Sequence, residues 1–590
     1  MADAQDKAPF PAMVALPSAE DVQQWTAVMV RAQTMLAEHA AKMATTPAAA
    51  PDLGMMFDPA RWQALPGMAA MTQVAANAWA QGLENWQKML GGDFAAFSAP
   101  PIPDKRFAAP EWTNNLVFAI LRQSYAAIAE QMLGAADALD GIDPVVKAKL
   151  RFATQSLVDA MAPTNLAFTN PQVIERAMAT RGESLLKGLE HLLGDMARGQ
   201  MTHVDSSAFT IGENIAATPG KVVHETPLYQ LIHYAPTTPD VLAIPLVVFP
   251  PWINRYYILD LNPGKSFVKW CVDNGISLFM VSWKSADASM RDIVWDDYIA
   301  AQLDAIDTIR TRLKVPSVHA IGYCVAGTTL AATLAVLAAK DAADKVASAT
   351  FFTAQVDFEL AGDLKLFVDE GHLALLEQLS APGFLDGRYM AATFNLLRGR
   401  DLIWNYVVNN YLMGNDYPPF DLLYWNGDTT NLPAKWHRQY LTELYRDNRL
   451  VVPGSLRAQG VPIDLHTIVT PAFIQAGRED HIAPADSVWR IMHHLSGPKN
   501  FVLAGSGHIA GVVNPPAAQK YQYWTGDNDA ASLADFVAGA AETKGSWWPY
   551  WLDWVRAQDP ATVAAKGARV PGGKGNPAIE EAPGRYVTMP

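Results

Sequence analysis

The sequence contains little cysteine and little charge. Its 590 residues include two cysteines, Cys271 and Cys324, which excludes a disulfide framework and a cysteine-based zinc site and is typical of a reducing, cytosolic compartment. Charged residues make up 18% of the chain, below the roughly 25% of an average soluble protein. The net charge is −14 and no basic stripe is visible, so we expect no nucleic-acid partner.

Signals for secretion or membrane insertion are also weak. Residues 1–13, MADAQDKAPFPAM, lack the basic start and apolar core of a signal peptide. Residues 320–339 carry no charge and are long enough, by count, to span a bilayer. Gly322 and Gly327 within this run favour the alternative, a buried strand that turns tightly into a buried helix. We therefore expect no transmembrane segment.

The chain has two parts with different patterns. Its length allows several domains, because one hydrophobic core rarely serves more than about 250–300 residues. Residues 1–200 read as a mostly helical domain, with helices predicted over 21–43, 69–90, 112–133 and 145–161. Proline-rich breaks separate them at 45–52 and 98–104. This pattern predicts a helical bundle without chemistry of its own, apart from a role in assembly.

Residues 201–590 alternate between strand and helix patterns. Strands are predicted over 228–234, 245–249, 277–283, 317–323, 347–353, 467–475 and 500–504. Such alternation predicts an α/β fold with a mostly parallel sheet and helices on both faces. The stretch from about 355 to 465 is too long for one crossover and is rich in aromatic residues. We expect an inserted cap over the carboxyl ends of the strands.

One motif of this part carries chemistry. Between a predicted strand and a predicted helix stands G-x-C-x-A-G, the layout of the nucleophile elbow of an α/β-hydrolase fold, with Cys324 as the nucleophile. Gly322 provides the small residue before it, whereas Ala326 stands where the usual pattern has glycine, and Gly327 follows. The amino end of the helix favours a thiolate and a developing oxyanion. The alternative is an unreactive cysteine in a strand-to-helix turn.

Two further residues stand where this fold places its acid and its histidine. Asp480 follows one predicted strand and His508 follows the next, which matches the chain order nucleophile, acid, histidine. Taken singly, a turn aspartate and a surface histidine are the more common interpretations. Together with Cys324 they predict a Cys-His-Asp triad. The His493–His494 pair has no acidic or cysteine partner nearby in the sequence, so we expect no metal site and no cofactor.

The choice of cysteine also bears on the reaction. An acyl-cysteine is a thioester, so exchange with a thioester substrate costs little free energy, and transfer to a hydroxyl group then runs downhill. Cys324 therefore indicates acyl transfer from a thioester, although some hydrolases of this fold also use cysteine.

Several segments of the sequence resemble the polyhydroxyalkanoate synthases. The resemblance rests on GYCVAG (322–327), AGREDHIAP (476–484), GHIAGVVNPP (507–516), PPWINRYYILDLNP (250–263), VSWKSADAS (281–289), VWDDYI (294–299), LLYWNGDTTNLP (422–433), DKRFAAPEW (104–112), APTNLAFTNP (162–171) and FTIGENIAATPGKVV (209–223). It covers most of the chain from about residue 100. The length and the APGRYV tail (582–587) are similar to the class I enzymes, which act on short-chain substrates. The family box is usually G-x-C-x-G-G, from which Ala326 departs.

The resemblance implies roles for the triad. Cys324 would take the (R)-3-hydroxyacyl group from coenzyme A, and His508 would act as the general base. Asp480 would either orient His508 or help to activate the incoming 3-hydroxyl group.

The resemblance also implies how the rest of the site works. The oxyanion would be held by the backbone N–H of Val325 and by a second donor, placed at Trp252 or Ile253. The aromatic insert, including Trp425, would cover the site and exclude water. A core aromatic of the cap is the alternative for Trp425.

The expected function is then polymerisation of (R)-3-hydroxyacyl-CoA, most simply (R)-3-hydroxybutyryl-CoA, into a polyester with release of coenzyme A. The helical N-terminal domain would serve homodimer formation and contact with the cytoplasmic polyester granule. A cysteine-dependent thioesterase or esterase of the same fold is the alternative, and an inactive granule-coating protein is a third.

Overall fold

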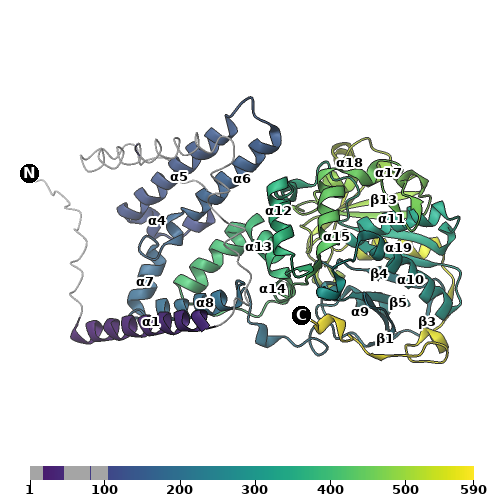
Figure 1. Cartoon of the computed structure of the whole chain (residues 1–590), viewed down its shortest axis with the longest axis horizontal. Coiled ribbons are helices and arrows are strands. Elements are labelled where there is room, and N and C mark those ends of the chain that lie inside the picture. The colour runs from purple at the N-terminus through teal and green to yellow at the C-terminus, as the bar shows by residue number, and fades with distance from the viewer. Residues whose placement is uncertain (1–17, 46–79, 81–103) are drawn as a thin grey trace, which may run out of the picture. The chain divides into compact units, whose positions relative to one another are not determined.

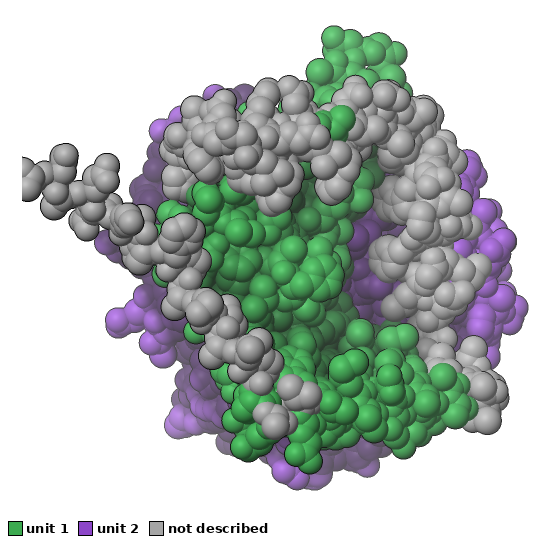
Figure 2. All heavy atoms as spheres, turned by 90° about the vertical axis from the view of Figure 1, so that its left-hand side faces the viewer, with its two compact units in different colours: residues 1–202, 398–417 green, residues 203–397, 418–590 purple. Residues whose placement is uncertain are grey.

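The computed structural model describes residues 18–45, 80 and 104–590. The chain forms two compact units (Figures 1 and 2). Unit 1 comprises residues 1–202 and 398–417, and unit 2 comprises residues 203–397 and 418–590. The helix expected over 69–90 lies, except for residue 80, outside the described residues. Among the helices that are described, none is both long and apolar enough to cross a membrane.

Unit 1 is helical, as its sequence pattern predicts. Its helices are α1 (Ala19–Thr45), α4 (Glu111–Asn114), α5 (Leu116–Asp137), α6 (Pro144–Ala160), α7 (Pro171–Ala179) and α8 (Glu183–Arg198). Polar side chains cap their amino ends: Asn115 accepts from the Val117 N–H, Asp143 from Val145 and Val146, and Asn170 from Gln172. Proline at the first position of α6 and of α7 fits a helix start, because its missing N–H has no intrahelical partner there.

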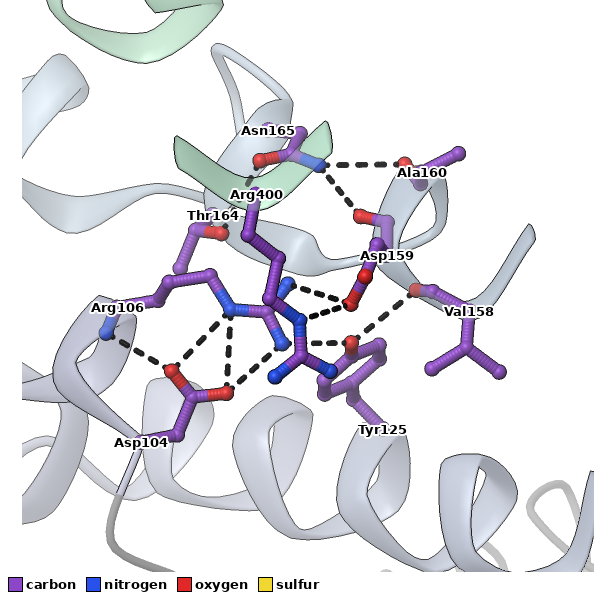
Figure 3. A network of polar contacts seen from close by, with 9 residues as sticks. All are labelled: Asp104, Arg106, Tyr125, Val158, Asp159, Ala160, Thr164, Asn165 and Arg400. Atoms are coloured by element: carbon purple, nitrogen blue, oxygen red, sulfur yellow. Dashed lines mark hydrogen bonds and ion pairs between the residues drawn. The ribbon is translucent and has the colours of Figure 1, made fainter. Parts of the chain in front are cut away.

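A polar network ties α5 and α6 to a distant part of the chain (Figure 3). Arg106 donates to Asp104 at 2.8 Å through Nη2 and to the Tyr125 hydroxyl at 3.0 Å. Its Nη1 lies 3.5 Å from Asp159 Oδ1, and that carboxylate also accepts from Arg400 Nε at 2.6 Å. Two guanidinium groups therefore compensate two carboxylates at this partly buried position. Arg400 lies 241 residues after Asp159 in the sequence.

Arg400 belongs to residues 398–417, here called the strap, which fall within the insertion expected from the sequence. The strap contains the π-helical turns Arg400–Trp404 and Val407–Leu412 and lies against α8. The Tyr411 hydroxyl donates to the buried Asp195 at 2.5 Å, and Lys187 pairs with Asp416 at 2.6 Å. The backbones meet at Gly188, where a Cβ atom would lie 1.8 Å from the Tyr411 carbonyl oxygen.

Unit 2 is built on one mixed, eleven-stranded sheet. In spatial order its strands are β15 (Ala541–Lys544), β14 (Gln522–Thr525), β13 (Lys499–Ala504), β12 (Ala472–Gly477), β7 (Val346–Phe352), β6 (Val318–Tyr323), β4 (Leu246–Phe249), β5 (Leu278–Trp283), β2 (Tyr229–Tyr234), β1 (Gly220–Glu225) and β17 (Glu580–Glu581). The six from β13 to β5 are parallel, and the remaining pairs are antiparallel. The expected α/β-hydrolase arrangement is confirmed.

Helices pack on this sheet in two pairs. Helix α10 (Trp295–Leu313) contacts α11 (Val325–Ala339), and α11 follows β6 directly. Helices α9 (Phe267–Asp273) and α19 (Trp548–Gln558) meet through Phe267 and Trp548, with ring centroids 5.0 Å apart. The charge-free run 320–339 is thus the end of β6 and a buried α11, which explains its hydropathy without a membrane.

The part of unit 2 between β7 and β12 is here called the cap. Its helices are α12 (Glu370–Leu379), α13 (Gly387–Leu397), α14 (Asp421–Gly427) and α15 (Ala434–Gln439), and α15 continues into a π-helical turn, Tyr440–Arg446 (Figure 1). The expected extended tail after residue 566 adds β17 to the sheet edge and buries Tyr586.

The contact between α8 and the strap leads to a stability prediction. Gly188→Ala would place a methyl group against the Tyr411 carbonyl, and overpacking of this kind costs about 1–3 kcal/mol. Gly194→Ala in the same helix is the matched control. There a Cβ would meet only the Arg198 guanidinium at 3.8 Å, so we expect a gain of about 0.5–1 kcal/mol from helix propensity. Denaturant unfolding measures both, and equal effects would contradict the close approach.

Candidate active site

Cys324 occupies the sharp turn between β6 and α11. Its φ of 52° and ψ of −127° lie in a region that residues with a Cβ rarely adopt. The Cys324 N–H donates to the Phe352 carbonyl at the end of β7 at 2.9 Å, which holds the turn on the sheet. The side chain is part-exposed, whereas the other cysteine, Cys271, is buried in α9. Burial raises the pKa of Cys271 well above its usual value, as expected for a core thiol.

Two glycines make this turn possible. A Cβ atom at Gly322 would lie 2.5 Å from the Gly327 Cα, and one at Gly327 would lie 2.4 Å from the Ala354 Cβ. Strand and helix therefore touch at 322 and 327. Ala326 is fully buried in α11, and its carbonyl accepts from the Gln302 side chain at 3.0 Å. The departure from the family box thus falls at a position that has room for a methyl group.

The predicted acid and histidine lie together. Asp480 follows β12 and His508 follows β13, and Asp480 Oδ2 lies 2.7 Å from His508 Nδ1. The second carboxylate oxygen of Asp480 accepts from the Ile482 and Ala483 N–H groups at 2.8 and 2.9 Å. The Tyr323 hydroxyl donates to the His508 carbonyl at 3.1 Å. The Asp480 side chain is fully buried, so the carboxylate is fixed on both sides.

This arrangement leaves the other ring nitrogen of His508 for Cys324. With Nδ1 used by Asp480, Nε2 is the ring nitrogen that remains to interact with the Cys324 sulfur. Burial by itself would lower the pKa of His508. The Asp480 carboxylate and the Cys324 sulfur outweigh burial and raise the pKa to about 10. The geometry thus favours an imidazolium beside a carboxylate and a sulfur.

The residues expected to bind an oxyanion lie on the two segments next to Cys324. Val325 is the first residue of α11, and its N–H donates to no group in the described part of the chain. The register pairs Phe249 of β4 with Gly322 of β6, so the loop that carries Trp252 and Ile253 leaves the sheet beside Cys324. The Trp252 carbonyl accepts from the Thr430 hydroxyl at 2.7 Å, which fixes this loop to the cap.

Trp425 lies in α14 with 5% of its surface exposed. Its indole N–H donates to the Arg255 carbonyl at 2.7 Å. This contact joins the cap to the loop after β4. Two buried cap residues that were not among the sequence-based candidates, Tyr440 and Tyr445, lie near the elbow helix. The Tyr445 hydroxyl accepts from Gln355 Nε2 at 3.2 Å, and the Gln355 carbonyl accepts from Thr328 of α11. Only the aromatic richness of the insert pointed toward them.

Over the described ranges, no group of three or more histidine, cysteine, aspartate or glutamate side chains is placed to hold a metal ion.

Fold and site define a protein of the α/β-hydrolase class with a cysteine at the nucleophile position. Family models agree: residues 250–515 match the alpha/beta hydrolase fold, and residues 103–271 match the N-terminus of poly-beta-hydroxybutyrate polymerase (PhaC).

Curated relatives narrow the class to one family. The chain is 46% identical over 495 residues to a poly(3-hydroxyalkanoate) polymerase subunit PhaC of Rhizobium meliloti, covering 82% of this chain and 80% of the relative. It is 44% identical over 512 residues to the subunit PhaC of Cupriavidus necator, with 85% of each covered. A poly(3-hydroxyalkanoate) polymerase of Methylorubrum extorquens is 43% identical over 537 residues, covering 89% of this chain and 87% of the relative. The chain belongs to the poly(3-hydroxyalkanoate) polymerase family, and it is an enzyme of the acyltransferase type.

The elbow yields a prediction about its glycines. Gly327→Ala would press a methyl group against Ala354 and against the Gly322 carbonyl, so we expect a loss of about 1–3 kcal/mol in unfolding free energy, with loss of activity. Ala326→Gly, the matched control, restores the usual family box and should cost only the roughly 0.5–1 kcal/mol of a glycine in a helix. If the two variants were equally stable and active, the contact at 327 would not constrain the turn.

The His508–Asp480 pair yields a prediction about pH. Because the pKa of His508 is raised from 6.5 to about 10 on folding, the pair stabilises the fold fully below pH 6.5. This contribution is lost as the pH rises toward 10. Asp480→Asn should therefore destabilise the protein more at a pH just below 6.5 than near 10. Denaturant titrations of both proteins across this range test the sign, and a penalty that grows with pH would contradict it.

Proposed function

We propose that the protein polymerises (R)-3-hydroxyacyl-CoA, most simply (R)-3-hydroxybutyryl-CoA, into a polyester and releases coenzyme A. The proposal rests on the arrangement in which Asp480 contacts His508 and His508 interacts with Cys324 at the elbow. The chain that carries this arrangement belongs to the polymerase family.

The first step is acylation of the nucleophile. The Cys324 thiolate, paired with the His508 imidazolium, adds to the thioester carbonyl of the substrate. A bond forms between the Cys324 sulfur and the acyl carbon, and the bond from that carbon to the coenzyme A sulfur breaks. The departing thiolate takes the proton of His508. Asp480 holds the imidazole so that Nε2 faces the sulfur throughout.

The second step is transfer to a hydroxyl group. The 3-hydroxyl oxygen of another acyl unit attacks the acyl-cysteine while its proton passes to His508. A carbon–oxygen ester bond forms, the bond to Cys324 breaks, and the thiolate returns. Each cycle therefore adds one hydroxyacyl unit and frees one coenzyme A thiol. In this scheme Asp480 acts through His508, the simpler of the two roles that the family resemblance implies.

The negative charge that develops on the acyl oxygen needs hydrogen-bond donors. The Val325 N–H, at the amino end of α11, supplies one donor together with the helix dipole. The second donor belongs to the loop after β4, at Trp252 or Ile253. Its position beside Gly322 and its tie to Thr430 support this assignment.

Water must be kept from the acyl-cysteine, because hydrolysis would end the chain. The cap serves this purpose in our proposal, and Trp425 contributes by fixing α14 to the Arg255 carbonyl.

Unit 1 would contact the polyester. Four exposed apolar residues that follow one another from α6 into the next loop support this: Leu157, Met161, Leu166 and Phe168. We propose homodimer formation and a place at the cytoplasmic granule on the family resemblance.

The central test mixes the protein with (R)-3-hydroxybutyryl-CoA and follows free thiol and acyl product together. We expect thiol release with insoluble polyester. Free 3-hydroxybutyrate as the only product would instead show a thioesterase, and an absence of thiol release would contradict the substrate.

A pair of cysteine variants tests the nucleophile. Cys324→Ala should reduce thiol release to background, since loss of a triad nucleophile costs on the order of 10⁶ in rate. Cys271→Ala is the matched control and should retain near-normal turnover, because that thiol is fully buried in the core as part of α9. Near-normal activity of Cys324→Ala would overturn the mechanism.

A further inference from the structure

The cap brings two buried tyrosines to the reaction centre. Tyr440 and Tyr445 expose 7% and 4% of their surface, and their ring centroids are 5.4 Å apart. Tyr440 stacks on Trp436 at 5.1 Å, and Trp436 meets Trp252 edge-on at 5.1 Å. An unbroken row of aromatic rings therefore joins the pair to the loop after β4.

The pair is tied on its other side to the elbow helix. Gln355, in the segment after β7, donates from Nε2 to the Tyr445 hydroxyl at 3.2 Å. The Gln355 carbonyl accepts from the Thr328 hydroxyl at 2.7 Å, and Thr328 lies one turn of α11 beyond Cys324. The tyrosines are thus fixed between the two elements that border Cys324.

Electrostatics agree with this placement. Burial raises the pKa of both phenols, and the Cys324 sulfur raises it further in each case. Asp480 acts in the same direction on Tyr445. Both groups therefore remain neutral hydroxyls, able to donate and to accept, throughout the pH range in which the enzyme would work.

The Tyr445 hydroxyl has a hydrogen-bonding position that the described part of the protein does not fill. A phenol offers one donor and two acceptor positions. Contacts with Gln355 and with the neighbouring tyrosine use two of the three positions of Tyr445, and within the described residues no further partner is seen for it. A buried polar position left open costs free energy unless a ligand fills it.

The substrate has one group that would fill it. A 3-hydroxyacyl chain carries two polar positions, the thioester carbonyl and the 3-hydroxyl. The carbonyl belongs to the oxyanion donors, which leaves the hydroxyl, two carbons away, for a second polar site. We propose that Tyr445, supported by Tyr440, binds the 3-hydroxyl of the acyl group at Cys324 and so selects hydroxyacyl over plain acyl thioesters. This inference rests on the proposed function.

The expected size of the effect follows from one hydrogen bond in a buried site. If the hydrogen bond from Tyr445 is lost while the 3-hydroxyl of the ligand stays buried, binding weakens by about tenfold to a hundredfold. A plain acyl chain has no hydroxyl to lose, so its binding should not depend on Tyr445. The two ligands together separate recognition of the hydroxyl from general support of the cap.

The test measures binding in the Cys324→Ala protein, where no reaction occurs. Calorimetry gives the dissociation constants of (R)-3-hydroxybutyryl-CoA and of butyryl-CoA, with and without Tyr445→Phe. We expect tighter binding of the hydroxylated ligand by the parent, an advantage that Tyr445→Phe removes, and an unchanged constant for butyryl-CoA. Tyr424→Phe, a partly exposed tyrosine of α14, is the matched control and should preserve the advantage.

Other outcomes overturn the inference. Equal weakening of both ligands by Tyr445→Phe would show a purely structural role. An advantage that survives the substitution, or a parent protein that binds both ligands equally, would place hydroxyl recognition elsewhere. Failure of the parent to bind either ligand would count against the proposed function itself. In the otherwise unchanged enzyme, Tyr445→Phe should lower kcat/KM for the hydroxylated substrate by the same factor, without a change in thermal stability that accounts for it.

Discussion

The contact between Gly322 and Gly327 is the constraint on which the active site depends. Strand β6 and helix α11 approach closely there, and Cys324, one of the four residues between the two glycines, turns through a positive φ angle. The strain lifts the Cys324 side chain above the sheet and leaves the first N–H groups of α11 unoccupied. Packing of two glycines thereby raises the thiol of Cys324 and, in our proposal, provides the site for the developing negative charge.

Parallel strand order supplies the rest of the site. The strands β4, β6, β7, β12 and β13 end at one edge, so the segments after them converge although they are far apart in sequence. This is why the sequence could place Asp480 and His508 at the same edge: six of the seven predicted strands match the observed ones to within one residue, and Asp480 and His508 each follow a strand. The exception, predicted over 467–475, begins at Ala472, because Leu465–Thr467 forms a 3₁₀ turn and Pro471 offers no N–H to a sheet.

Other features left no readable signal in the sequence. The antiparallel strands β14, β15 and β17, near the two ends of the sheet, are short or exposed, so their alternation is weak. In the insert, tryptophan and tyrosine appear without a regular period, so the sequence does not show that Tyr445 accepts from Gln355 or that Trp425 donates to the Arg255 carbonyl. The spacing of the elbow motif showed the departure at Ala326 but not that 327 is the crowded position, since crowding depends on Ala354 from another segment.

The strap limits how the protein can be truncated into fragments that each contain one whole unit. The chain passes between the two units three times, at residues 202–203, 397–398 and 417–418, so a single cut cannot separate them. A fragment that starts at residue 203 would keep the strap but lose α8, leaving Asn410 and Tyr411 without their hydrogen-bond partners His191 and Asp195. The helices of unit 1 thus support a segment from the second half of the chain, so a truncation before residue 203 removes more than the surface proposed to contact the granule.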